Sequence, residues 1–188
     1  MQYVTFLRAI NVAGHATVKM ADLKTAFASA GCRQVVTLIQ SGNVIFESAE
    51  KKALLFQNIH TKLGQLLGDD PVLVTRTARE LEQLVTTCPF SGIKAGSDPK
   101  LYVVFMGRKP AIRPALPLVQ PQEALEAIAM TDREVFIVSR RKKNGFYGFP
   151  NNFIEKELGV PATTRNWSTV TKIVAALRQS AVSNQSAI

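Results

Sequence analysis

The fold is decided by residues 35–46, VVTLIQSGNVIF, in which two β-prone runs flank a short polar stretch. The first run ends at Ile39 and the second begins at Val44. The Gln-Ser-Gly-Asn between them is typical of tight turns, where glycine supplies backbone conformations that other residues avoid. Short β-prone runs joined by such a turn predict an antiparallel hairpin.

Strand-like and helix-like patterns alternate on both sides of this hairpin. Residues 3–10 are β-prone and apolar, and residues 20–30 carry apolar side chains at helical spacing. A longer amphipathic helix is expected over residues 55–66, followed by a short strand at residues 71–76. The order strand-helix-strand-strand-helix-strand predicts an α+β protein whose N-terminal unit is ferredoxin-like, with an antiparallel sheet and both helices on one face.

The rest of the chain continues the α+β pattern. Thr77 and Glu80 form a capping box, which predicts a third helix after the last strand. A strand is expected at residues 101–106, and four prolines beyond it exclude a helix or an inner strand. Residues 127–139 read as a second hairpin, and apolar residues at helical spacing from Trp167 predict a final helix.

These patterns predict three parts along the chain. Residues 1–90 are expected to form the ferredoxin-like subdomain, and residues 91–179 a smaller α+β subdomain. Residues 180–188 lack periodicity and are expected to be a disordered tail.

The composition indicates a globular protein. Hydrophobic residues make up 46% of the 188 residues and charged residues 20%, which excludes the disordered class. No apolar stretch reaches the roughly 18–20 residues that a membrane span needs. Without such a span, we expect no membrane partner that would require an inserted segment. Cys32 and Cys88 lie far apart without a partner motif, so we expect free thiols in a cytoplasmic protein and no metal site.

Positive charge is concentrated in the second half of the chain. Through residue 90 there are nine Lys and Arg against seven Asp and Glu, a net charge of +2. From residue 91 there are fourteen against seven, a net charge of +7. Such asymmetry indicates an anionic partner, namely nucleic acid, a phosphorylated metabolite or a membrane surface, with plain solubility as the alternative.

Four consecutive cations in this half are followed by three aromatic residues. The cations are Arg140, Arg141, Lys142 and Lys143, and the aromatic residues are Phe146, Tyr147 and Phe149. Cations suit phosphates and aromatic faces suit bases, so the four cations are candidates for nucleic-acid binding. The alternative is a solvated turn followed by aromatic residues of the core.

Three segments resemble the bacterial family of unknown function DUF1697. They are residues 6–14 (FLRAINVAG), 39–46 (IQSGNVIF) and 161–167 (PATTRNW). Their order and spacing fit the family pattern across nearly the whole chain, although the family usually has glycine at the positions of Ala9 and Ala13. The resemblance implies an α+β fold that begins with a ferredoxin-like unit, and it implies no substrate, reaction or cofactor.

Polar residues of the three segments are candidates for ligand binding. They are Arg8, Asn11, Gln40, Ser41, Asn43, Arg165 and Asn166. Asparagine and serine also hold turns, and Asn166 is placed to cap the final helix. An arginine on an apolar strand or beside a tryptophan needs an anionic or carbonyl-rich partner. We therefore hypothesise that the three segments converge on a shared polar pocket.

Two classes of function stay open. The favoured class is a binding module for an anionic partner, either nucleic acid or a phosphorylated small molecule. The alternative is a small-molecule enzyme with a pocket around Arg8, Asn43 and Arg165. No constellation of His, Cys or carboxylate groups stands out for catalysis, and no Gly-rich nucleotide fingerprint is present, so we expect no cofactor.

Overall fold

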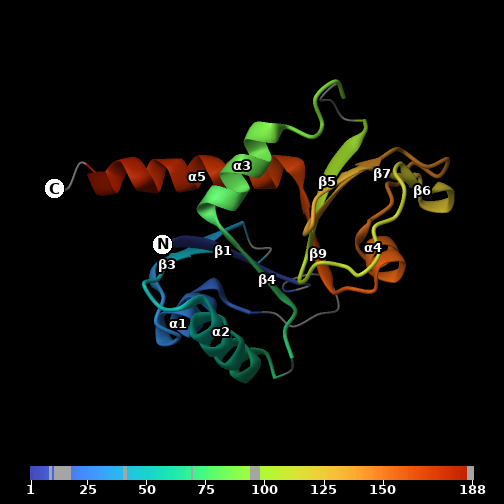
Figure 1. Cartoon of the computed structure of the whole chain (residues 1–188). Coiled ribbons are helices and arrows are strands. Elements are labelled where there is room, and N and C mark those ends of the chain that lie inside the picture. The colour runs from blue at the N-terminus through green and yellow to red at the C-terminus, as the bar shows by residue number, and fades with distance from the viewer. Residues whose placement is uncertain (9, 11–17, 40–41, 69, 94–97, 186–188) are drawn as a thin grey trace. The chain divides into compact units, whose positions relative to one another are not determined.

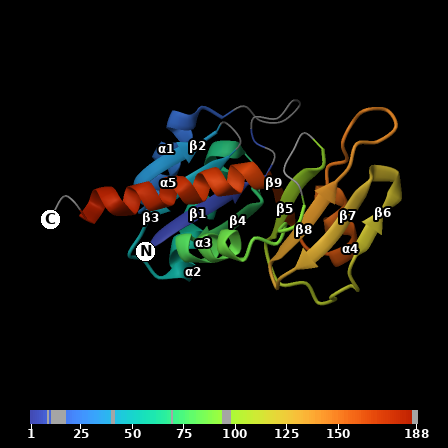
Figure 2. The same cartoon turned by 90° about the horizontal axis from the view of Figure 1, so that it is seen from above.

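The computed structural model describes residues 1–8, 10, 18–39, 42–68, 70–93 and 98–185. The chain forms two compact units, Met1–Glu80 and Leu81–Ile188. Each unit contains an antiparallel sheet with helices (Figures 1 and 2). The predicted α+β class is therefore confirmed.

The described residues of the first unit form four strands and two complete helices. In chain order they are β1 (Gln2–Leu7), α1 (Met20–Ser29), β2 (Arg33–Leu38), β3 (Asn43–Glu47), α2 (Lys52–Leu67) and β4 (Leu73–Thr77). The strand order in the sheet is β2-β3-β1-β4, and all neighbours are antiparallel. The expected hairpin is the pair β2 and β3, in which Leu38 lies opposite Asn43.

One face of this sheet builds a core with α1 and α2, which lie side by side in Figure 1. Tyr3 lies opposite Phe46 across β1 and β3, and their rings stack with centroids 5.5 Å apart. Phe27 of α1 brings its ring to 5.2 Å from that of Phe46, and α2 adds the fully buried Leu63. Burying each such side chain stabilises the fold by about 1.5–3 kcal/mol.

Five strands are described in the second unit, outside residues 94–97 and 186–188, and helix α3 (Ala78–Thr87) leads into this unit along the chain. The other elements are β5 (Lys100–Met106), β6 (Leu118–Gln120), the 3-10 turn η1 (Pro121–Glu123), β7 (Leu125–Met130), β8 (Glu134–Ser139), α4 (Asn151–Leu158), β9 (Ala162–Asn166) and α5 (Trp167–Gln185). The strand order is β6-β7-β8-β5-β9. The predicted second hairpin is the antiparallel pair β7 and β8.

Helices α4 and α5 lie on opposite sides of this sheet (Figure 1). On the α4 side, Ile154 is fully buried in a cluster with alternate residues of β5 such as Val104. On the α5 side, Trp167 meets Phe90 edge to face at 5.2 Å, and Phe90 meets Phe136 in the same way at 5.8 Å. Trp167, the first residue of the predicted final helix, therefore packs on this side of the sheet.

Two expected boundaries differ from the structure. Helix α5 continues to Gln185, so the expectation of a tail disordered from residue 180 is wrong for residues 180–185. Those residues include no Gly or Pro, so nothing in them ends a helix that packing has already started. The boundary between the two units lies within α3, between Glu80 and Leu81, whereas the sequence pattern placed it at residue 90.

No helix in the described ranges has the length and apolar character needed to cross a membrane.

Candidate nucleic-acid interface

The predicted basic run forms one arm of a short loop that follows β8 in the second unit, drawn in orange in Figure 2. The chain reverses at Lys142–Gly145, where the Gly145 N–H donates to the Lys142 carbonyl at 2.9 Å. Gly145 has a φ of +84°, a conformation that glycine adopts without steric cost. The returning arm pairs with the first, because the Lys142 N–H donates to the Phe146 carbonyl at 2.8 Å. Cations on one arm thus lie beside aromatic residues on the other.

Acidic residues engage two of the four predicted cations. Arg140 lies 3.2 Å from Glu126, and Lys142 lies 3.0 Å from Glu123. The pair of Arg140 and Glu126 is largely exposed, and such pairs contribute about 0–1 kcal/mol, so a phosphate can replace this carboxylate at little cost. The pair of Lys142 and Glu123 is partly buried. Lys143 is exposed and forms no ion pair within the described part of the chain.

Tyr147 gathers two further cations around its ring. The Lys100 Nζ lies 4.4 Å from the ring centroid, and the Arg141 Cζ lies 5.6 Å from it. Arg141 Nε also donates to the Tyr147 hydroxyl at 3.4 Å, and this contact raises the pKa of Arg141 above its usual value. Lys100 belongs to this surface, but the sequence did not predict it. Lys100 is the first residue of β5, far from the loop in sequence, and only the pairing of β5 with β8 brings it opposite Ser139.

Two aromatic side chains of the loop are displayed to solvent. Phe146 is 70% exposed and Phe149 is 60% exposed. Phe149 packs edge to face on Tyr102, with centroids 5.9 Å apart, and so keeps its ring at the end of the sheet. The alternative that these aromatic residues belong to the core is therefore wrong for Phe146 and Phe149.

Tertiary contacts position the returning arm. The Ser139 hydroxyl, buried at the end of β8, donates to the Gly148 carbonyl at 3.0 Å. A Cβ at Gly148 would lie 2.2 Å from the Glu123 carbonyl oxygen, which is far inside van der Waals contact. Glycine at this position therefore lets the arm pack against η1, and a side chain there would push the arm away.

Of the remaining candidates in the first unit, the structure describes Asn43 and Arg8. Asn43 is fully buried, and its Nδ2 donates to the Leu38 carbonyl at 3.0 Å, closing the turn between β2 and β3. Arg8 is partly buried just after β1, and its backbone N–H donates to the Val72 carbonyl at 3.0 Å. Candidates Asn11, Gln40 and Ser41 lie outside the described residues.

Arg165 and Asn166 lie on β9 of the second unit. The buried Arg165 Nη1 donates to the Thr163 hydroxyl and to the Thr164 carbonyl, both at 2.8 Å. Burial lowers the pKa of Arg165 to about 10, so the guanidinium stays charged at neutral pH. Asn166 is exposed and pairs with Tyr102, as the last residue of the strand.

The hypothesis of a shared pocket concerns side chains from both units. Arg8 and Asn43 belong to the first unit, whereas Arg165 and Asn166 belong to the second. The hydrogen bonds given above join Asn43 and Arg165 to residues of their own units. Convergence of the three segments stays a prediction.

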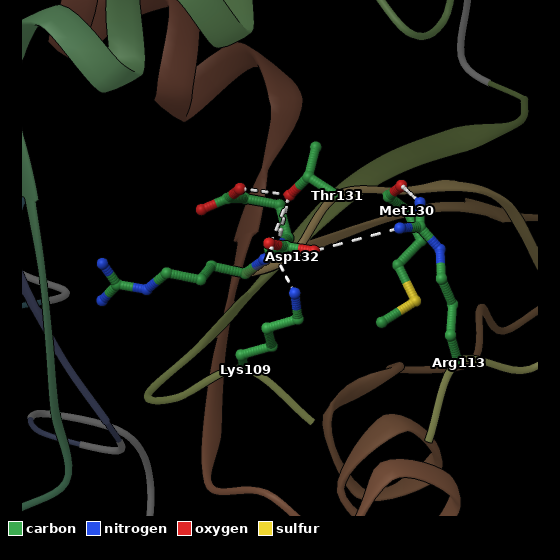
Figure 3. Close-up of polar contacts among 7 residues, drawn as sticks. Lys109, Arg113, Met130, Thr131 and Asp132 are labelled. Carbon is green, nitrogen blue, oxygen red and sulfur yellow. Dashed lines mark hydrogen bonds and ion pairs between the residues drawn. The ribbon is translucent and has the colours of Figure 1, made fainter. Parts of the chain in front are cut away.

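A second polar cluster lies at the other end of β8, and its charged side chains form ion pairs with one another (Figure 3). Asp132 in the turn between β7 and β8 pairs with Lys109 at 2.9 Å and with Arg113 at 3.9 Å. Arg113 also donates to the Met130 carbonyl at 2.8 Å, and the Thr131 hydroxyl accepts from backbone N–H groups of the turn. The hydrogen bond from Lys109 lowers the pKa of Asp132. This cluster ties the proline-rich segment to the hairpin.

In the described ranges, no group of three or more His, Cys, Asp or Glu side chains is placed to hold a metal ion. The chemistry displayed at the end of the second sheet is instead positive charge beside exposed aromatic rings. Those two properties together match phosphates and bases.

Comparison with known proteins adds a family and a fold. A match to the family described as "Protein of unknown function (DUF1697)" covers residues 1–136. No curated protein matches the chain. The structure of a conserved bacterial protein, SP0830 from Streptococcus pneumoniae, is similar with a TM-score of 0.63 at 21% sequence identity. That likeness covers 93% of this chain and 97% of the other, and at this identity it shows the fold alone.

Proposed function

This chain belongs to the DUF1697 family, whose description assigns no activity, and we propose from its surface chemistry that it is a nucleic-acid-binding module. We define the candidate interface as the loop of residues 140–149 together with Lys100. The observation that carries the proposal is that Phe146 and Phe149 are exposed directly beside a run of cations.

The charge of this surface favours a polyanion. Lys100, Arg141 and Lys143 form no ion pair with a carboxylate at 4.0 Å or less in the described ranges, so their charge is available to phosphates. Each phosphate contact releases counterions, which gives nucleic-acid binding its salt dependence. The excess of positive charge after residue 90 adds a long-range attraction for the negatively charged phosphates.

The proposal extends to the fold and the location. We propose that Met1–Glu80 is ferredoxin-like, supported by its strand order β2-β3-β1-β4 and by the packing of α1 and α2 on one face. A cytoplasmic location is supported by the two free cysteines, Cys32 and Cys88.

The test is fluorescence anisotropy with labelled oligonucleotides of mixed sequence over a salt series. We expect binding at low salt that weakens as salt rises. The double variant Arg141→Gln, Lys143→Gln should reduce the slope of log K against log salt by about 1–2, because it removes two phosphate contacts. Lys172→Gln, which removes an exposed charge from α5, is the matched control and should leave the slope unchanged.

Two results would overturn the proposal. One is the absence of binding at low salt. The other is an equal loss of affinity in the Lys172→Gln control and in the double variant, which would mean that only overall charge matters.

A further inference from the structure

We infer that the candidate interface takes single-stranded nucleic acid, with unpaired bases stacked on the rings of Phe146 and Phe149. This inference rests on the proposed function and narrows its substrate class. Bases of a duplex are stacked on one another, whereas bases of a single strand offer both faces to aromatic side chains.

The distribution of phenylalanine in the chain argues for a role at the surface. Seven of the ten phenylalanines are buried and Phe56 is partly buried. The two that remain are Phe146 and Phe149, and both lie in the same loop. Two exposed aromatic rings in one loop favour a role in binding over a role in packing.

The two rings are carried by an ordered backbone. The Phe146 N–H donates to Asn144 Oδ1 at 3.1 Å, and its carbonyl accepts from Lys142 at 2.8 Å. Phe149 rests on Tyr102 and follows Gly148, whose carbonyl is held by Ser139. A surface organised before binding loses less conformational entropy when a ligand docks.

Two cations lie beside Tyr147, the residue that follows Phe146 in the chain. Lys100 and Arg141 contact the ring of Tyr147, which separates Phe146 from Phe149 in the chain. Alternation of aromatic rings with cations is the arrangement that single-strand-binding surfaces use, with bases on the rings and phosphates on the charges.

The tip of the loop argues against a membrane as the partner. Insertion into a bilayer requires apolar residues at the tip, with cations behind them at the headgroups. Here the reversal consists of Lys142, Lys143, Asn144 and Gly145, and the aromatic residues lie behind it. A charged tip of this kind stays in water.

The experiment compares one labelled oligonucleotide as a single strand and as a duplex, with two variants of one exposed ring. We expect the single strand to bind more tightly than the duplex at equal salt. Phe146→Leu keeps an apolar side chain but removes the aromatic face, and should weaken single-strand binding by about tenfold. Phe146→Trp restores a larger face and should bind at least as well as the unmodified protein. Because Phe146 is exposed, neither variant should disturb the fold.

The outcomes separate this inference from the proposed function. If duplex and single strand bind equally and Phe146→Leu has no effect, while Arg141→Gln with Lys143→Gln still weakens binding, the inference is wrong and the proposed function stands. If no oligonucleotide binds, both fail. A third outcome is that the protein binds no oligonucleotide but sediments with anionic vesicles, and that Phe146→Leu abolishes this sedimentation. That outcome would overturn both the inference and the proposed function, because the partner would then be a membrane surface.

Discussion

Replacing Gly42 with alanine should destabilise the first unit by more than an ordinary substitution in a turn. Gly42 precedes β3, and its carbonyl accepts the Leu7 N–H at 2.8 Å, which joins the turn to β1. Its φ is +71°, and a Cβ built there would lie 2.8 Å from Ile10 Cγ1 and 3.0 Å from Leu7 Cβ. The new methyl group therefore meets both an unfavourable backbone conformation and occupied space.

The two costs have separate magnitudes. A left-handed conformation costs an L-residue about 1–2 kcal/mol relative to glycine. Forcing a methyl group into a packed site costs about 1–3 kcal/mol. Together they predict a loss of about 2–5 kcal/mol in the free energy of unfolding for Gly42→Ala. Gly68→Ala is the matched control, because Gly68 has a φ of +77° but no heavy atom within 4 Å of its virtual Cβ. It should show the conformational cost alone.

Urea unfolding followed by circular dichroism measures both variants. The cost of Gly42→Ala should also shrink when Ile10→Ala is present, because that change removes the nearest atoms. Equal losses for Gly42→Ala and Gly68→Ala, or full additivity with Ile10→Ala, would refute the steric argument.

Three further predictions follow from local contacts. Burial raises the pKa of Cys32 to about 12, so iodoacetamide should label only the exposed Cys88 in the folded protein and both thiols in urea. Lys109 lowers the pKa of Asp132, so this pair stabilises the fold above pH 3.8 and its contribution is lost as pH falls through the lowered pKa. Asp132→Asn should therefore lower the melting temperature at neutral pH, and the difference should vanish in acid. Thr77→Val removes the hydroxyl that caps α3 and should cost about 1 kcal/mol in urea unfolding.

Each of these predictions has a contrary outcome. Rapid labelling of Cys32 in the folded protein would show that its site opens. A melting difference for Asp132→Asn that persists in acid would assign the loss to something other than the ion pair. Thr86→Val is the control for the cap, because its hydroxyl is exposed and bonds only within the helix, to the Glu82 carbonyl. Equal losses in the two threonine variants would contradict a capping role.

Several elements were predicted correctly because their signals are local. The turn at Gly42 joins two antiparallel strands as its composition indicated. The capping box forms, with the Thr77 N–H donating to Glu80 at 2.6 Å and the Glu80 N–H donating to the Thr77 hydroxyl at 3.2 Å. Such bonds join residues only a few positions apart, so the residue types alone specify them.

Strand β9 was not predicted, because it depends on pairing with a strand that is distant in the sequence. Its residues Thr163, Thr164 and Arg165 are polar, so the segment reads as a loop that ends at a helix cap. Pairing with β5 makes it a strand and satisfies its backbone groups. The buried Arg165 is accommodated by oxygen atoms of the same strand, which only the folded backbone orients.

The features of the candidate interface also divide into those that the sequence determined and those that the tertiary structure determined. The sequence by itself determined that cations and aromatic residues follow one another over residues 140–149, and that positive charge is in excess after residue 90. Only the tertiary structure decided that Phe146 and Phe149 are exposed while their neighbour Tyr147 contacts Lys100. The physical reason is that charge belongs to a residue wherever it lies, whereas exposure depends on which distant parts of the chain pack against it.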